Sequence, residues 1–404
     1  MDWEFTALQP GPGPLKVSLL SSGNATLIEI IRGEIRRSGP ISFARFMELA
    51  LYHPEHGYYS SDRAALGRHG DYFTNVSVGP VFGELLASQF VEIWEELGKP
   101  SDFVLVEQGA HHGEFARDLL QAVRAKRPEF SSRLRYRIVE PFARLQESQR
   151  ETLSAFAAQV DWSVSIEALG QFRGVHFSNE LFDALPVHLI AAQSDLTGAT
   201  VGPWMERRVG FKQNEFAFTN QKITDPSLRE RTHKLPIRPA RYETEINLAA
   251  LRLVRDLSRK LTHGYMIAID YGFSNSEFYD EHRSTGTLQC RAQHHLHESP
   301  FTTIGEADIT AHVEWTSLVA EAETSGFALA GFTDQHHFLT GLLAASPEIA
   351  QQASPKVRRA LQTLFHPEML GRSFQVLALS RNIETPIPLS GFKFARNARP
   401  SLSL

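Results

Sequence analysis

Residues 103–113, FVLVEQGAHHG, decide the fold. The run Phe103–Glu107 predicts a buried strand, and the turn that follows it contains Gly109 and Gly113. Apolar residues then recur at helical spacing between Phe115 and Val123. A glycine turn between a parallel strand and a helix brings the backbone close to a ligand, and the helix start offers free N–H groups. The stretch therefore predicts a ligand-binding strand–turn–helix unit of an α/β protein, although a tight turn between packed elements would look similar.

The glycine pattern also restricts which ligand is expected. In the dinucleotide pattern G-x-G-x-x-G a second glycine lets the pyrophosphate approach the backbone, but His111 stands at that position here. A ligand without a phosphate at this point fits the turn better. A nicotinamide-dependent dehydrogenase is therefore disfavoured.

Further strands and helices alternate along the chain on both sides of this unit. Strand patterns occur at 136–140, 162–164, 175–178 and 266–270, and helical patterns lie between them, the last over 242–261. Alternation of this kind indicates a parallel sheet with right-handed crossovers. The predicted fold class is therefore α/β.

The remaining segments suggest three regions. Residues 1–24 are rich in Pro, Gly and Ser and predict a flexible N-terminal arm. Residues 25–98 predict a helical extension with a long aromatic and glycine-rich loop over 52–80. Residues 99–404 contain the alternating elements, with a polar insertion at about 204–241 that has antiparallel strand patterns.

Composition excludes several classes of protein. The net charge of −5 disfavours a general nucleic-acid binder, and no apolar run approaches the ~18 residues of a membrane-spanning segment. Cys290 is the only cysteine, so an internal disulfide and a zinc site built on cysteines are excluded. Two acids in the first four residues do not fit a signal peptide. We expect a cytoplasmic, bacterial protein; a homodimer is compatible with the sequence but not required by it.

Two acidic positions follow predicted strands. Glu140 ends the second strand, where a carboxylate can accept hydrogen bonds from two ribose hydroxyls, although a surface acid could also stand there. Residues 178–186, SNELFDALP, follow the fourth strand and contain Asn179, Glu180 and Asp183. Burying such groups is costly unless a ligand or partner satisfies them, but the segment could also cap the next helix. Because parallel strands end at one edge of the sheet, we expect these acids to converge with the glycine turn.

Histidine is abundant, with 17 residues, and His294, His295, His297 and Glu298 lie close together in the sequence. Their spacing differs from the helical H-E-x-x-H arrangement and from the usual zinc spacings. We therefore expect no metal.

From about residue 25 to 345 the chain resembles the MidA-like methyltransferases, which include the mitochondrial complex I assembly-factor arginine methyltransferase and bacterial relatives. The resemblance is carried by a series of short motifs in a fixed order. They are Tyr52-His53-Pro54 with Gly57-Tyr58-Tyr59, Gly70-Asp71-Tyr72-Phe73-Thr74, Phe82-Gly83-Glu84, Glu107-Gln108-Gly109-Ala110 with Gly113, Asn179 to Val187, Trp204 with Glu206-Arg207, Asp270-Tyr271-Gly272, Gly286-Thr287-Leu288 and Asp308 to Val313.

The resemblance implies a Rossmann-like class I methyltransferase core, with the helical N-terminal addition and an inserted subdomain, that binds S-adenosylmethionine. The implied cofactor-binding residues are Glu107, Gly109, Ala110 and Gly113 in the turn, Glu140 at the ribose, Asp161 and Trp162 near the adenine, and Asp71 and Thr74 in a covering loop. Typical members resemble G-A-G-x-G in the turn, whereas this chain has His111 at the third position.

The implied reaction is methyl transfer to an arginine side chain of a protein partner. A guanidinium is always charged at neutral pH, so carboxylates should hold it. Glu180 and Asp183 are the predicted catalytic residues, Asn179 would orient them, and Glu206 is a weaker candidate. A small-molecule acceptor and a non-catalytic assembly factor that binds S-adenosylmethionine are the alternatives.

Overall fold

The computed structural model describes residues 21–61, 74–194, 201–236, 238–239, 241–292, 295–297, 299–384 and 388–404. The predicted arm, residues 1–24, falls outside this part of the chain except for its last four residues, and Asp71 falls outside it too. His294 and Glu298, from the histidine-rich stretch, also lie outside the described residues.

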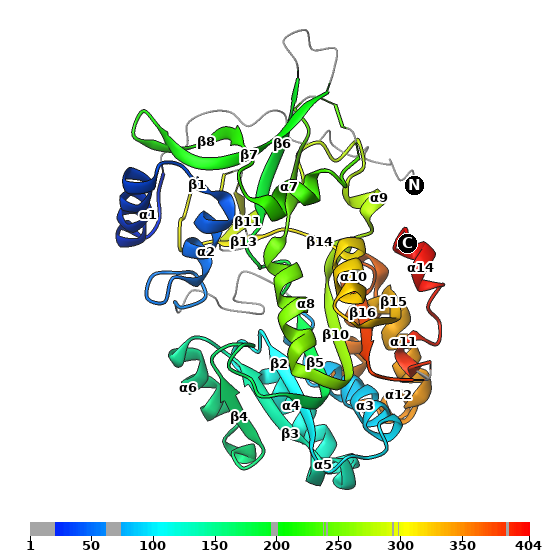
Figure 1. Ribbon diagram of the computed structural model, residues 1–404. Coiled ribbons are helices and arrows are strands. Elements are labelled where there is room, and N and C mark those ends of the chain that lie inside the picture. The colour runs from blue at the N-terminus through cyan, green and yellow to red at the C-terminus, as the bar shows by residue number, and fades with distance from the viewer. Residues whose placement is uncertain are drawn as a thin grey trace, which may run out of the picture.

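A twisted central sheet forms the lower half of the molecule (Figure 1). Its strand order is β15-β16-β10-β5-β2-β3-β4, and the short β14 pairs with β10. The strands are β2 (Phe103–Gln108), β3 (Arg135–Val139), β4 (Val160–Ser163), β5 (Phe172–Asn179), β10 (Leu261–Phe273), β14 (Val313–Glu314), β15 (Ala328–Asp334) and β16 (Phe374–Arg381). β2 lies between β3 and β5, so the chain changes direction across the sheet at that point.

The five strands predicted from the sequence are present and parallel, because β4, β3, β2, β5 and β10 pair in parallel register. The antiparallel strands β15 and β16 at the other edge were not predicted. The pattern over 242–261 was wrong in part: Glu243–Ile246 is strand β9, and helix α8 begins only at Leu248.

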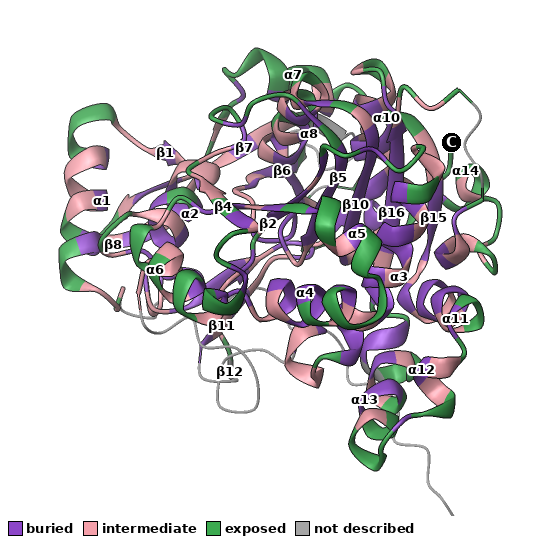
Figure 2. Cartoon of the chain, turned by 90° about the horizontal axis from the view of Figure 1, so that it is seen from below, coloured by how far each residue is buried: buried purple, intermediate pink, exposed green. Residues whose placement is uncertain are grey.

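Helices cover both faces of the central sheet, and the strand interiors are buried (Figures 1 and 2). Alternate residues of β10 point to opposite faces, as the period of a strand requires: Tyr265 and Ile267 join the core under α3, α4 and α11, whereas Met266 and Ala268 join the core under α8 and α10. The large helices are α3 (Val81–Glu96), α4 (Glu114–Lys126), α8 (Leu248–Lys260), α10 (Trp315–Thr324), α11 (Gln335–Ala345) and α13 (Pro355–Phe365).

A second, smaller core lies above the central sheet in Figure 1. It joins the N-terminal helices to two antiparallel sheets, with Leu27, Phe46, Val209, Phe216 and Ile309 packed together. The elements are α1 (Ala25–Ser38), α2 (Phe43–Tyr52), β1 (Ile41–Ser42), β6 (His188–Ser194), β7 (Val201–Lys212), β8 (Glu215–Lys222), β9 (Glu243–Ile246), β11 (Gln289–Ala292), β12 (His295–His297) and β13 (Asp308–Thr310).

The antiparallel sheet around β7 includes strands from outside the insertion expected at 204–241. β7 and β8 correspond to the two strand patterns of the insertion, but β7 also pairs with β6 and with β1 of the N-terminal extension. The extension and the insertion therefore share one hydrophobic core.

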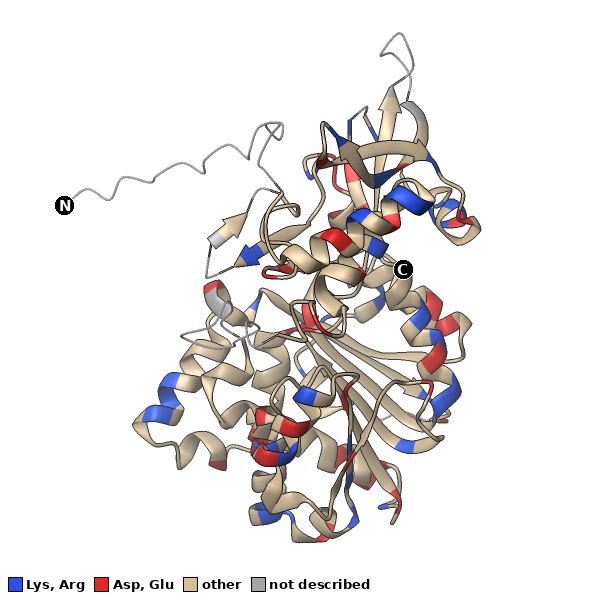
Figure 3. Ribbon diagram, turned by 90° about the vertical axis from the view of Figure 1, so that its left-hand side faces the viewer, with Lys and Arg blue, Asp and Glu red and all other residues tan. Residues whose placement is uncertain are grey.

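The remaining elements are short or peripheral. They are α5 (Pro128–Arg133), α6 (Ala143–Thr152), α7 (Pro226–Thr232), α9 (Asn275–Phe278), α12 (Glu348–Gln351), α14 (Ala398–Ser401), the 3₁₀ turns Val76–Val78, Ser154–Phe156 and Ser390–Phe392, and the π turn Pro367–Gly371. Within the described residues, no helix combines the length and apolar character needed to cross a bilayer. Basic and acidic residues are interspersed along the outer helices (Figure 3).

Candidate active site

A cavity of about 480 Å³ lies between the carboxyl edge of the central sheet and the second core. It lies beyond the carboxyl ends of the neighbouring strands β2 and β5, where the chain changes direction across the sheet, which is the position at which open α/β sheets bind ligands. Its volume is in the ordinary range for a small-ligand site. The lining includes the predicted residues Thr74, Glu107, Gly109, Ala110, Glu140, Asn179, Glu180 and Asp183.

The turn after β2 has the backbone conformation that the sequence predicted. Gly109 and Gly113 both have φ of 84°, in the left-handed region that favours glycine. Gly113 precedes the first residue of α4, and its N–H donates to the Ala110 carbonyl oxygen over 2.8 Å. His111 also adopts positive φ, at 47°, so the turn accommodates a histidine where a glycine was expected.

Two buried carboxyl groups stand at the ends of β2 and β3. Tyr136 donates its hydroxyl to Glu107 over 2.7 Å. Glu140 accepts the Phe142 N–H at one oxygen (3.0 Å) and the Gln149 side-chain amide at the other (3.1 Å). Burial raises the pKa of Glu107 to about 8 and that of Glu140 to about 7, and the hydrogen bonds partly oppose this effect.

The acidic segment after β5 is held by Asp270, which the sequence analysis named within a family motif but gave no role. One oxygen of Asp270, on β10, accepts the backbone N–H groups of Leu181, Phe182 and Asp183 over 3.0, 2.8 and 3.3 Å. Glu180 has φ of 55°, which lets the chain turn sharply at this point. Asp270 therefore fixes the turn that presents Glu180 and Asp183 to the cavity.

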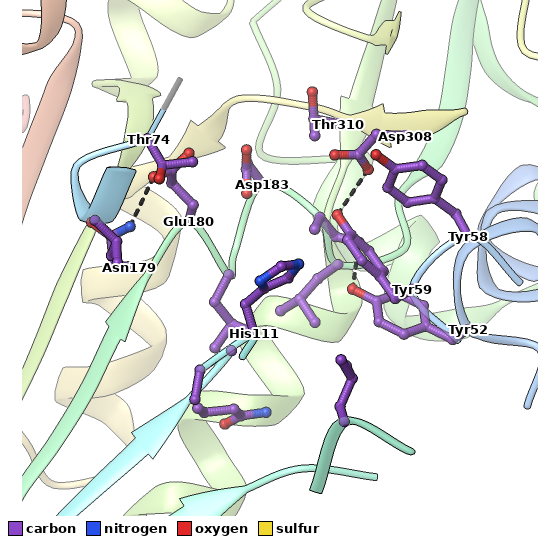
Figure 4. Close-up of a pocket in the computed structure, with 18 of the residues that line it drawn as sticks. Tyr52, Tyr58, Tyr59, Thr74, His111, Asn179, Glu180, Asp183, Asp308 and Thr310 are labelled. Atoms are coloured by element: carbon purple, nitrogen blue, oxygen red, sulfur yellow. Dashed lines mark hydrogen bonds between the residues drawn. The ribbon is translucent and has the colours of Figure 1, made fainter. Parts of the chain in front are cut away.

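Glu180, Asp183 and Asp308 follow one another along one side of the pocket, with His111 below them in Figure 4. Burial raises the pKa of Glu180 to about 8, and the charges of Asp270 and Asp308 add to the effect. The pKa of Asp183 is raised well above its usual value by burial and by the charges of Asp270, Glu180 and Asp308. Clustered acids of this kind favour a cationic ligand, because an opposite charge would restore the ionised forms.

A chain of side-chain amides leads to Glu180 from the start of α11. Gln335, at the start of α11, donates to the Asn75 side-chain oxygen (2.8 Å), and Asn75 donates to Asn179 (2.9 Å). Asn179 donates to Glu180 over 2.8 Å, and the Asn75 backbone N–H also hydrogen-bonds the Glu180 carboxylate. Asn179 therefore contacts the carboxylate that it was predicted to orient, and it is itself held by Asn75, which was not predicted.

Aromatic residues of the N-terminal extension, Tyr52, Tyr58 and Tyr59, line the pocket beside Asp308, at the end away from Glu180 (Figure 4). Tyr59 donates its hydroxyl to Asp308 over 2.8 Å, and Tyr52 donates to the Ala184 carbonyl oxygen over 3.0 Å. The extension thus contributes directly to the cavity, and Asp308 connects it to β13.

Three residues expected at the cofactor do not line the pocket. Gly113 lies behind the turn, against Leu153. Trp162 packs beside the core and donates its indole N–H to Gln149 over 2.9 Å. The side chain of Asp161 is about half exposed and pairs with Arg137, its cross-strand partner, over 2.8 Å. Side chains alternate along β4, so Asp161 and Trp162 cannot both face the same way.

Glu206 also lies away from the pocket. It accepts hydrogen bonds from His188 (2.9 Å) and Arg208 (2.8 Å) within the antiparallel sheet. Burial alone would raise its pKa, but these two partners lower the pKa overall. The weaker candidate from the sequence is thus a structural ion pair. Among the described residues, no three His, Cys, Asp or Glu side chains are arranged to hold a metal ion.

Comparison with known proteins gives a family for this arrangement. Residues 85–333 match a family described as putative S-adenosyl-L-methionine-dependent methyltransferase. The chain belongs to this family. A crystal structure of a protein from Burkholderia thailandensis bound to S-adenosyl-homocysteine superposes on the methyltransferase with a TM-score of 0.81 and 33% identity, covering 94% of this chain and 96% of the other. The predicted Rossmann-like class I fold and the S-adenosylmethionine cofactor are confirmed.

Curated relatives extend over nearly the same length. The mitochondrial "protein arginine methyltransferase NDUFAF7 homolog" of Drosophila melanogaster is 27% identical, covering 92% of this chain and 88% of the relative. The corresponding human protein is 26% identical, covering 91% of this chain and 85% of its own length.

The residues of the methyltransferase fit the cofactor. Each carboxylate oxygen of Glu140 has one donor from within the protein and keeps a further lone pair, so the group can accept ribose hydroxyls. Phe142 and Leu145 add an apolar wall beside it. The positive-φ turn brings the backbone of Gly109 and Ala110 to the cavity without a bulky side chain.

Sequence reasoning missed several residues that shape the site. The role of Asp270, which was named only within a motif, could have been found, because this residue ends a predicted strand as Glu140 does. Asn75, Gln149 and Gln335 carry no such signal, because an isolated amide in a loop or helix does not show what it will contact.

Proposed function

We propose that this methyltransferase transfers a methyl group to an arginine side chain of a protein partner. The observation that carries the proposal is the row of Glu180, Asp183 and Asp308 beside the cofactor turn. Curated relatives named protein arginine methyltransferases support the choice of acceptor.

The electrostatics of the row suit a guanidinium. The charge of Glu180 helps to raise the pKa of the buried Asp183, the charges of Asp270 and Asp308 act on both groups, and neither group forms an ion pair with a described Lys or Arg. An incoming guanidinium is always charged and offers a planar set of N–H donors. Its charge would favour the ionised carboxylates, so binding of the acceptor should release protons and tighten as pH rises.

S-adenosylmethionine supplies a methyl group that is already electrophilic, because it is bonded to a sulfonium. The protein must therefore orient the acceptor and exclude water. Glu180, held by the amides of Asn179 and Asn75, would fix the guanidinium nitrogen. A methylated guanidinium keeps a single positive charge by losing one proton, which Glu180, Asp183 or water would accept.

Glu180→Gln tests the proposal. We expect labelled-methyl transfer to protein in a lysate to fall by roughly 10²-fold or more, because a charge-assisted contact made at the reacting group is lost. Calorimetric binding of S-adenosylhomocysteine should stay within about twofold, since Glu180 is assigned to the acceptor. Glu147→Gln, an exposed change of the same type on α6, is the control.

The outcomes separate the three hypotheses. Label recovered only in the small-molecule fraction would favour a small-molecule acceptor. Binding of S-adenosylhomocysteine without any transfer would favour a non-catalytic assembly factor. Unchanged protein methylation by Glu180→Gln would reject the assigned role of that residue.

The setting of the protein is also part of the proposal. A bacterial, cytoplasmic protein is supported by the similarity to the Burkholderia thailandensis structure and by a buried, unbridged Cys290. Fractionation of the source cells tests the location. Light scattering of the purified chain tests the homodimer.

A further inference from the structure

Gln149, on helix α6, lies directly behind the cofactor side of the pocket. Its side chain is fully buried, yet it does not line the cavity. Its amide nitrogen donates to the carbonyl oxygen of His111 over 2.7 Å and to the Glu140 carboxylate over 3.1 Å. Its amide oxygen accepts the indole N–H of Trp162 over 2.9 Å.

Chemistry fixes the orientation of this amide. An indole N–H can only donate, so the Gln149 oxygen must face Trp162. The two amide hydrogens then face the His111 carbonyl oxygen and the Glu140 carboxylate. A carbonyl oxygen can only accept a hydrogen bond, and so can an ionised carboxylate. The reversed amide would place like groups against all three partners.

The three partners belong to three different parts of the sheet edge. His111 is in the turn after β2, Glu140 follows β3 and Trp162 is in β4. Among the described residues, Gln149 is the side chain that hydrogen-bonds all three of these positions. We infer that Gln149 is a positioning residue for cofactor binding, which holds the glycine turn and the ribose carboxylate in register with each other.

Two further observations support a role beyond filling space. A buried amide is costly unless its groups are satisfied, and an apolar side chain of similar size would fill this site without that cost. The Gln149 donor and the Phe142 N–H approach Glu140 on separate oxygens, so the carboxylate is restrained at both. A carboxylate held in this way is prepared to receive two hydroxyl groups.

The test measures binding of S-adenosylhomocysteine to the full chain by calorimetry, so it needs no knowledge of the methyl acceptor. Gln149→Met keeps the length of the side chain and removes its donors and acceptor; we expect binding to weaken roughly tenfold. Gln149→Glu keeps an acceptor for Trp162 but places a second carboxyl beside Glu140; we expect a larger loss. Gln159→Glu, at the amino end of β4 where Gln159 donates to the Ser131 carbonyl oxygen, is the matched control and should bind normally.

A double-variant cycle separates positioning from general support of the fold. If Gln149 acts through Glu140, then Glu140→Gln and Gln149→Met together should cost little more than either alone, rather than the roughly 100-fold expected from two independent tenfold losses. Circular dichroism of each apo variant establishes that the fold is retained. Binding within twofold of the wild type for Gln149→Met, or additive losses in the double variant, would overturn the inference.

Discussion

The two ends of the pocket surround their carboxyl groups with different neighbours. At the cofactor end, Glu140 has its own hydrogen-bond donors, a backbone N–H and the Gln149 amide. At the acidic end, Asp183 lies among Asp270, Glu180 and Asp308, whose charges oppose its ionisation. The first end is prepared for neutral hydroxyl groups, and the second holds an unfavourable cluster that a cation would relieve. The site is therefore asymmetric in charge before any ligand binds.

The acidic end depends most strongly on Asp270. Asp270→Ala would leave the N–H groups of Leu181, Phe182 and Asp183 without their acceptor in a buried site. We expect the free energy of unfolding, measured by urea denaturation, to fall by roughly 3–5 kcal/mol, with methyl transfer lost. Asp270→Asn keeps one oxygen acceptor and should cost less. Equal losses in the two variants would show that Asp270 does not act through these N–H groups.

Asn75 gives a sharper test of the acidic end, because it should affect transfer without affecting the cofactor. Asn75→Ala removes the link between Gln335 and Asn179, which leaves Glu180 with fewer constraints. We expect labelled-methyl transfer to fall roughly tenfold and S-adenosylhomocysteine affinity to stay within about twofold. Asn220→Ala, on the exposed face of β8, is the control. A weaker cofactor affinity in the Asn75 variant would mean that the two ends are not independent.

Both ends contribute to the pH dependence of stability. Burial raises the folded pKa of Glu107 and Glu180 to about 8 and of Glu140 to about 7, above the ordinary value near 4.5. At a pH between the ordinary pKa and the raised pKa, the folded protein binds more protons than the unfolded chain. The unfolding free energy therefore falls as pH rises from about 5 to 8. We expect a loss of up to roughly 3 kcal/mol per group, measured by urea denaturation of the apoprotein. Glu107→Gln should flatten the curve, and a curve that rises with pH would contradict the raised values.

The cofactor end was largely predictable from sequence, because its signals are local. A short run of residues is enough to indicate the strand, the glycine turn and the acid after the next strand. Parallel strands then bring these residues together, because their carboxyl ends lie at one edge of the sheet. The turn, Glu140 and the segment from Asn179 to Asp183 therefore converge as predicted. The arginine acceptor, in contrast, stays a proposal.

The features that were not predicted depend on contacts between distant parts of the chain. β1 of the N-terminal extension pairs with β7 across more than 160 residues, and β16 pairs back onto β10. Gln149 and Gln335 acquire their roles only from what packs against them. For Asp161 the limit is different: the strand pattern at 162–164 found β4, which spans Val160–Ser163, but did not show which way each side chain points.

Substitution of Asp161 should have the smallest effect, and it tests whether the cofactor site extends as far as β4. Its side chain is about half exposed and pairs with Arg137, and exposed pairs of this kind contribute only about 0–1 kcal/mol. We expect Asp161→Asn to change the unfolding free energy by less than about 0.5 kcal/mol and to bind S-adenosylhomocysteine within twofold of the wild type. Glu140→Gln, measured alongside, should weaken binding roughly tenfold, because a buried carboxylate at the cavity is lost. If the Asp161 variant lost affinity to a similar degree, the cofactor would have to extend past the end of β4, and the cofactor site would be larger than the cavity.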